Sequence, residues 1–256
     1  MNGTPEADLS GLNLSKCPAE MAQLALTTKV LDMGFNDFQI FPDISIFGFQ
    51  FLEEFTLTGN QLTEIPATVS SLCNLTALNL NGNAIHTLPP ELGKLALLEK
   101  LDLSNNNLNK LLPEIGYLTN LHDLLLTGNP IGQLPRSIGR CVNMEVMDLS
   151  GCNLDNLPNE FTKMTKLMEL NLGNNNLTSL PSNIGRMTRL VMLNLCDNQV
   201  TDLPLSIGYC QGLMQCYLDR NPIRDKQILV SCKNGPDHLC DYLETRMLCM
   251  HSPLRL

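Results

Sequence analysis

The chain contains no tryptophan, and aromatic residues make up only 5% of its 256 residues. A core therefore cannot be built around a few large rings, although 43% of the residues are hydrophobic. Leucine, isoleucine and methionine have to supply the buried surface instead. This composition is typical of a core made of many stacked aliphatic layers.

Positive charge is also scarce, because 17 lysine and arginine residues stand against 26 aspartate and glutamate residues. The net charge of −9 and the isoelectric point near 4.9 oppose a general attraction to nucleic-acid phosphates or anionic lipids. No run of about 18 apolar residues is present, and the first residues lack the basic and apolar regions of a signal peptide. We expect no nucleic-acid partner and no membrane insertion.

Residues arranged for catalysis or metal binding are missing as well. The histidines are scattered, and none has a carboxylate or a cysteine at a metal-ligand or triad spacing. No glycine-rich phosphate loop is present, because the glycines of the "IG" and "LG" pairs recur at one position of a repeat. The prediction is a protein that is not an enzyme, with no cofactor, no metal site and no catalytic residue.

What the sequence does have is a period of 23 residues. Successive copies of the template LxxLxLxxNxLxxLPxxIxxLxx begin at Leu52, Leu75, Leu98, Leu121, Met144, Leu167, Leu190 and Leu213. The alternation at the start of each copy predicts one short strand, and the proline ends it. The apolar residues three apart that follow predict a short helical or irregular return. Units that stack in this way form one elongated domain.

The three asparagines of "GNNNL", Asn174 to Asn176, divide into two kinds. Backbone groups buried between stacked turns need a side chain that can both donate and accept hydrogen bonds. Asparagine does both, so Asn175 at the ninth template position is predicted to be scaffold, and its two neighbours to be surface. Cys152 replaces asparagine in one repeat and predicts a looser turn. The predicted ladder consists of Asn60, Asn83, Asn106, Asn129, Asn175, Asn198 and Asn221.

Four segments carry a resemblance to a known family: "LPPELGKL" (88–95), "LPRSIGRC" (134–141), "LPSNIGRM" (180–187) and "LPLSIGYC" (203–210). Over residues 28–223 the chain resembles intracellular leucine-rich-repeat proteins of the Ras group, which include Ras-suppressor-type scaffolds and plant relatives. The resemblance implies an α/β leucine-rich-repeat solenoid, a curved horseshoe with a parallel β-sheet on its concave face. Short helices or irregular segments would then cover the convex face.

The two ends depart from the period. Residues 1–27 keep part of the pattern and predict a degraded N-terminal repeat, and residues 28–223 form the repeats. Residues 224–256 predict a C-terminal helical cap, because apolar residues follow Gly235-Pro236 at helical spacing: Leu239, Tyr242, Leu243, Met247 and Met250. Within the repeats, Leu112 fills a proline position and Pro113 comes one residue late, a fault that we expect to stay local.

The ten cysteines are predicted to be free thiols. Cys141 and Cys210 fall on helix-side leucine positions and Cys216 on a strand leucine position, where a thiol acts as a small hydrophobic group. The sequence has no CxxC and no paired cysteines at either end. A thiol-rich core favours a reducing compartment, so we expect a cytoplasmic protein.

The outward strand positions predict a binding surface on the concave face. Carboxylates dominate the third and fifth template positions, while Leu125, Val146, Met192 and Tyr217 are apolar at positions expected to be exposed. Cations such as Arg140 and Arg186 lie on the helix side, which we interpret as a solubilising outer surface. The predicted protein-binding residues are Lys100, Asp102, Asp123, Leu125, Val146, Asp148, Glu169, Asn171, Met192, Asn194 and Tyr217.

Two functions stay open from the sequence. The first is a monomeric scaffold or adaptor in intracellular signalling, for which the resemblance implies a small GTPase of the Ras type or its effector as the partner. The second is a regulatory subunit that docks on an enzyme such as a protein phosphatase. An extracellular ligand-binding receptor is disfavoured, because the sequence lacks a signal peptide and cysteine-stapled ends.

Overall fold

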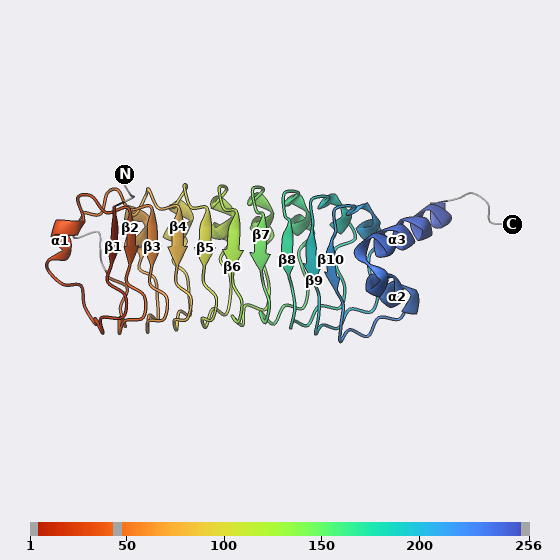
Figure 1. The fold of residues 1–256 in the computed structure, drawn as a ribbon, viewed down its shortest axis with the longest axis horizontal. Coiled ribbons are helices and arrows are strands. Elements are labelled where there is room, and N and C mark those ends of the chain that lie inside the picture. Colours follow the sequence, from red (N-terminus) through yellow and green to blue (C-terminus); the bar gives the residue numbers. More distant parts are fainter. Residues whose placement is uncertain (1–4, 43–47, 252–256) are drawn as a thin grey trace.

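The computed structural model describes residues 5–42 and 48–251, with side chains up to residue 248. Ten short strands lie side by side in one parallel sheet and follow the chain order, so that the molecule extends in one direction (Figure 1). The fold is the predicted α/β solenoid. The strands are β1 (Glu6–Asp8), β2 (Val30–Asp32), β3 (Glu54–Thr56), β4 (Ala77–Asn79), β5 (Lys100–Asp102), β6 (Asp123–Leu125), β7 (Val146–Asp148), β8 (Glu169–Asn171), β9 (Met192–Asn194) and β10 (Gln215–Tyr217).

Each strand forms where the template alternates apolar and polar residues. The central residue of the strand points into the core, as at Leu78 and Leu170, which are both fully buried. The two flanking residues point to solvent. Equivalent residues of neighbouring repeats pair directly, for example Lys100 with Asp123, so the 23-residue spacing is also the register of the sheet.

A row of short 3-10 helices forms the second layer, and the aliphatic core lies between this row and the sheet. Each helix packs on the helix of the next repeat. In the repeat starting at Leu167, Ile184 and the following Met187 are both fully buried, as predicted. The helices are η2 (Ala67–Ser71), η3 (Pro90–Lys94), η4 (Pro113–Tyr117), η5 (Arg136–Arg140), η6 (Asn159–Lys163), η7 (Ile184–Arg186) and η8 (Leu205–Tyr209).

The displaced proline in the repeat starting at Leu98 is absorbed locally, as expected. Leu112 takes φ −73° and ψ 150°, close to φ −75° and ψ 144° at Pro89, the equivalent residue of the preceding repeat. Pro113 then occupies the first helical position, where a missing N–H costs nothing because that N–H has no partner within the helix. The helix η4 therefore keeps its full five residues.

The asparagine ladder has the predicted structure. The Asn175 side-chain amide donates to the carbonyls of Leu149 and Leu172, both at 2.9 Å, and its oxygen accepts the Leu154 N–H at 2.9 Å. Leu149 and Leu154 belong to the preceding repeat, so this side chain fastens two repeats together. Side chains at all seven predicted positions bond in this manner: Asn60, Asn83, Asn106, Asn129, Asn175, Asn198 and Asn221.

At Cys152 the thiol keeps one half of this hydrogen bonding, the donated bond, and loses the other half, the accepted bond. The thiol donates to the Leu126 carbonyl at 3.2 Å but accepts nothing from Ile131, whose N–H bonds instead to the Asn129 carbonyl at 2.8 Å. The next residue, Asn153, takes a φ of +54°, a conformation that asparagine adopts more easily than most residues. The turn is thus bonded differently, and the looser turn that we expect there stays a prediction.

Substituting the three consecutive asparagines one at a time should separate their roles. We expect Asn175→Ala to lower the free energy of unfolding by about 1–3 kcal/mol, because it leaves buried backbone groups without partners. Asn176→Ala, at an exposed position, should change it little. Asn174→Ala should cost about 1–2 kcal/mol through its φ of +55°. Urea denaturation of the three variants measures the order, and equal losses at Asn175 and Asn176 would contradict the ladder.

The N-terminal segment contributes a strand to the sheet. β1 pairs with β2 in the same parallel register as the later strands, and the short helix α1 (Met21–Leu24) follows it. Leu12 stands at the ninth position of this first repeat, and Asn13 behind it takes a φ of +55°, as Asn153 does behind Cys152. In the aromatic segment "DISIFGFQF", residues 43–51, residues 43–47 lie outside the described residues.

Two helices, rather than the single one expected, follow the last strand (Figure 1). The predicted helix is α3 (Pro236–His251), in which Leu239 and Leu243 are fully buried and Tyr242 is half-buried; the side chain of Met250 lies outside the described residues. The helix that the sequence analysis missed is α2 (Lys226–Asn234). Its signal was present in Asp225, whose carboxylate caps the helix by accepting the Gln227 N–H at 2.9 Å.

Candidate functional site

The outward residues of the sheet form one continuous surface, which we call the strand face. It comprises the second, third and fifth template positions of the described repeats. Because the strands are parallel and in register, the fold brings the predicted binding residues of β5 to β10 together on this face. Val146, for example, lies between Asp123 and Glu169 on the neighbouring strands.

The predicted apolar residues are less open than expected. Leu125, Val146 and Met192 are half-buried, and of the four only Tyr217 is clearly exposed, at 44%. Their neighbours in register explain this, because Leu125 lies between Asp102 and Asp148. These side chains are partly covered on the face rather than projecting from it.

Carboxylates lie on the strand face along β1 to β8, except at β4. The two lysines among them are already paired, Lys29 with Glu53 and Lys100 with Asp123, the latter at 3.6 Å. The same positions around β9 and β10 carry no charged side chain. The face therefore has a long acidic part and a short uncharged part. The carboxylates are Glu6, Asp8, Asp32, Glu53, Glu54, Glu99, Asp102, Asp123, Glu145, Asp148 and Glu169.

A shallow hollow of about 260 Å³ lies on the acidic part, over β3 to β6. Four predicted binding residues line it: Lys100, Asp102, Asp123 and Leu125. Residues of β3 and β4 that we did not predict complete the lining, notably Glu54 and Asn79. The hollow combines an apolar floor with charged walls, an arrangement that can receive one side chain of a partner.

An apolar column that we did not predict runs from the edge of the acidic part into the uncharged part. Met168, Val191 and Met214 occupy the second template position of the last three repeats, one residue before each strand. The Val191 N–H donates to the Met168 carbonyl and the Met214 N–H to the Val191 carbonyl, both at 2.8 Å. Met168 is 41% and Met214 73% exposed. The second template position accepts any type of residue, so the repeat pattern does not single out these three residues. The one signal in the sequence is that they are uncharged.

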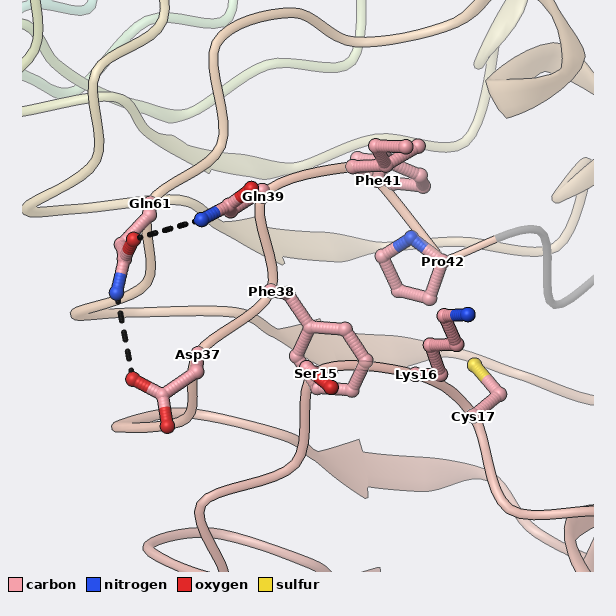
Figure 2. Close-up of a pocket in the computed structure, with 10 residues that line it drawn as sticks. Ser15, Lys16, Cys17, Asp37, Phe38, Gln39, Phe41, Pro42 and Gln61 are labelled. Atoms are coloured by element: carbon pink, nitrogen blue, oxygen red, sulfur yellow. Dashed lines mark hydrogen bonds between the residues drawn. The ribbon is translucent and has the colours of Figure 1, made fainter.

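A larger hollow of about 720 Å³ lies at the N-terminal end, away from the predicted site. Figure 2 shows Gln61 bridging Gln39 and Asp37 on one side of the hollow, with Phe38, Phe41 and Pro42 among the other lining residues. Phe38 and Phe41 are buried parts of the core. Pro42 leads directly into residues 43–47, which lie outside the described residues, so we assign no site here.

In the part of the chain that the structure describes, no three histidine, cysteine, aspartate or glutamate residues come together in a way that could hold a metal ion. No helix in that part has the length and apolar character needed to cross a bilayer.

No disulfide joins the nine cysteines whose side chains are described. The side chain of the tenth, Cys249, lies outside the described residues. This agrees with the prediction for nine of the ten. Cys141 and Cys210 are fully buried as expected, whereas Cys216 is only half-buried. Burial raises the pKa of Cys152 and of Cys210 to about 12, and that of Cys141 to about 11.

These thiols predict slow alkylation and a loss of stability at high pH. Iodoacetamide should modify exposed Cys73 quickly in the native chain and Cys152 only after unfolding. The folded chain holds the Cys152 proton more tightly than the unfolded chain, whose thiols titrate near 9.0. The contribution to stability is therefore complete below about pH 9 and is lost as the pH rises toward 12. Urea midpoints at about pH 8 and about pH 10.5 test this, and a Cys152→Ala variant should show a smaller drop.

Comparison with known proteins agrees with the repeat and the geometry. Residues 105–200 match the family described as a leucine-rich repeat region, and residues 74–95 match the Leucine Rich Repeat itself. The chain folds as a leucine-rich-repeat solenoid. No curated protein matches its sequence. The comparisons concern leucine-rich repeats in general, and the resemblance to the Ras group stays a prediction.

Solved leucine-rich-repeat structures are similar over most of this solenoid. A leucine-rich-repeat protein of Leptospira interrogans is 30% identical with a TM-score of 0.80, over 86% of this chain and 56% of that one. A TDR receptor is 28% identical with a TM-score of 0.73, over 80% of this chain and 37% of that one. The Toll–Spatzle complex of Drosophila is 21% identical with a TM-score of 0.72, over 82% and 29%. This solenoid thus spans about half the length of the Leptospira protein.

Proposed function

We propose that this chain is a non-enzymatic scaffold that binds a protein partner through the strand face. The observation that carries the proposal is the density of carboxylates on that face, of which only Glu53 and Asp123 have a lysine partner there. The eleven carboxylates and two lysines of this face give it a negative potential, which attracts a partner of opposite charge. A solenoid can use this surface for binding because its core lies elsewhere, between the sheet and the helices. One structural neighbour, the Toll–Spatzle structure, is itself a complex.

The partner would contact the strand face between β5 and β9, with Leu125, Val146 and Met192 as anchors. Asp102, Asp123, Asp148 and Glu169 would surround them and attract a basic or mixed-charge surface. Intracellular signalling in the cytoplasm is the setting that the resemblance implies, with a small GTPase of the Ras type or its effector as partner. The alternative is a regulatory subunit of a protein phosphatase.

Affinity capture from cytosol tests this function. We expect Leu125→Glu combined with Val146→Glu to abolish capture of a partner, because truncating or charging a central anchor costs about 2 kcal/mol or more. Both residues are half-buried, so circular dichroism and melting have to show an intact fold. A GTPase among the lost proteins supports the signalling scaffold, and a phosphatase catalytic subunit supports the alternative.

The matched control lies on the helix side of the solenoid. Arg140 and Arg186 are both exposed, on η5 and η7, and neither reaches the strand face. Arg140→Glu combined with Arg186→Glu should leave capture unchanged. If this pair alone abolishes capture, the partner binds the helix side and the proposed site is wrong.

A further inference from the structure

The apolar column at the C-terminal end of the strand face is not part of the hydrophobic core. Met187, a core residue of the same repeat as Met168, is fully buried, whereas Met168 is 41% exposed. Helix α3 packs against η8 and against α2, and the two helices leave Met214 73% exposed. Contiguous apolar residues left open on a folded protein mark interaction surfaces.

The column is continuous because backbone hydrogen bonds fix its members on consecutive repeats, about 5 Å apart. Met192, next to Val191 in sequence, and Tyr217 in β10 extend it across the face. Methionine side chains are unbranched and adapt to the shape of an apolar partner. The column can therefore hold apolar side chains of more than one shape.

A charge boundary lies directly beside this column. The Met168 N–H donates to the Glu145 carbonyl at 2.8 Å, and Glu169 pairs in register with Met192, so the last carboxylates of the face lie next to the first apolar residues. Lys166 and Arg189 flank the column on the side of the loops, with the Lys166 ammonium 2.7 Å from the Asn143 side-chain oxygen. The acidic part of the strand face thus ends where the apolar part begins.

We propose that the partner presents a two-part peptide segment to the strand face, with lysine or arginine residues at one end and apolar residues at the other. This deepens the proposed function and rests on it. The basic end lies over the carboxylates of β5 to β7, and the apolar end covers Met168, Val191 and Met214. Charge complementarity fixes the direction of the segment, because the apolar end meets no carboxylate past Glu169.

The geometry also gives the size of the segment. It runs across the strands from β5 to β10, which are five strand spacings apart, about 24 Å in all. About seven residues cover this distance in an extended conformation, and about 16 in a helix. A peptide of about 16 residues is therefore long enough in either conformation.

Selection from a random 16-residue peptide library displayed on phage, against the full chain, is the experiment. We expect enriched peptides to carry a basic cluster at one end and leucine, methionine or phenylalanine at the other. Met168→Ser combined with Met214→Ser should weaken these peptides about tenfold or more. Asp102→Lys combined with Asp123→Lys should weaken the same peptides and reduce the salt dependence of their binding.

Leu248→Ser is the control, because Leu248 is an apolar residue on α3 whose exposure, 65%, lies between those of Met168 and Met214. It should leave peptide binding unchanged. The methionines are exposed, so their replacement should keep the fold, and Met168→Ser alone provides a milder variant that should give a smaller loss in the same direction.

The outcomes separate this inference from the function beneath it. If the enriched peptides are basic throughout, bind the aspartate variants more weakly and bind the methionine variants as well as the wild type, the two-part segment is wrong. The strand face is then still the binding site. Peptides unaffected by every strand-face variant overturn both. A selection that enriches no peptide overturns the two-part segment, and capture from cytosol then decides the function by itself.

Discussion

Replacing Leu243 with aspartate should abolish cooperative folding of the C-terminal repeats. Leu243 is fully buried in α3 and belongs to the same hydrophobic core as the leucines of the repeats. Removing a buried leucine side chain costs about 2–5 kcal/mol, and burying an unpaired carboxylate in its place adds to that loss. A folded domain is stable by only about 5–15 kcal/mol, so one such change reaches the limit of what the solenoid can tolerate.

The reason is the position that α3 occupies. A β-carbon added at Gly208 would lie 2.7 Å from the Glu244 backbone nitrogen, while the equivalent glycines contact the helix of the following repeat. The helix α3 therefore stands where one more repeat would stand. Deleting residues 236–256 should expose the same apolar edge and lead to aggregation or lost cooperativity.

Urea denaturation and light scattering measure this effect. Leu248→Asp is the matched control, because Leu248 is 65% exposed on the same helix and should unfold at the wild-type midpoint. If Leu243→Asp also unfolds at the wild-type midpoint, or if the deleted chain stays monomeric with unchanged melting, the C-terminal helices are an appendage rather than a cap.

Gly116→Ala should have the second-largest effect, although it adds a single methyl group. Its β-carbon would lie 2.5 Å from the Ser137 carbonyl oxygen and 2.8 Å from the Ser137 β-carbon in the next repeat. Ser137 Oγ also donates to the Pro113 carbonyl at 2.7 Å, which holds the two helices close together. The backbones of η4 and η5 must separate, at a cost of about 3 kcal/mol.

The glycine control is Gly212, which has ordinary space around it. An added β-carbon there would meet only the Thr188 and Leu190 carbonyl oxygens, at 3.6 and 3.7 Å. Gly212→Ala should keep the wild-type melting temperature, whereas Gly116→Ala should lower it by several degrees. Equal melting of the two variants would show that adjacent repeats have freedom to move apart. Gly139 and Gly185 approach the next repeat more closely still, since an added β-carbon would lie 2.2 Å from the Glu160 carbonyl oxygen and 1.9 Å from that of Ser206, so their substitution should lower the melting temperature at least as much.

The periodic features were predictable because each follows from a rule that operates within one repeat. Alternation of apolar and polar residues gives the strand, and the need to satisfy buried backbone groups gives the asparagine at position nine. Helix α2 was also within reach through its cap at Asp225, but its residues do not follow the 23-residue period that guided the analysis.

Other features required the stacked structure. The eighth template position takes a positive φ at Gly82, Asn105 and Arg220, residues with little in common, because stacking imposes the turn on whatever residue is there. The sequence likewise predicts Leu125 and Val146 as apolar residues of two strands. Their half-burial depends on register partners in the adjacent strands, 23 residues away in the chain.

The sequence by itself determined the unit of this protein: the strand, the turn, the ladder asparagine and the direction in which each side chain points. The tertiary structure decided how the units combine. Stacking brought Met168, Val191 and Met214 into one column and left the column uncovered by the C-terminal helices. Local propensity acts over a few residues, whereas a surface is made by residues that are neighbours only after one repeat has packed on the next.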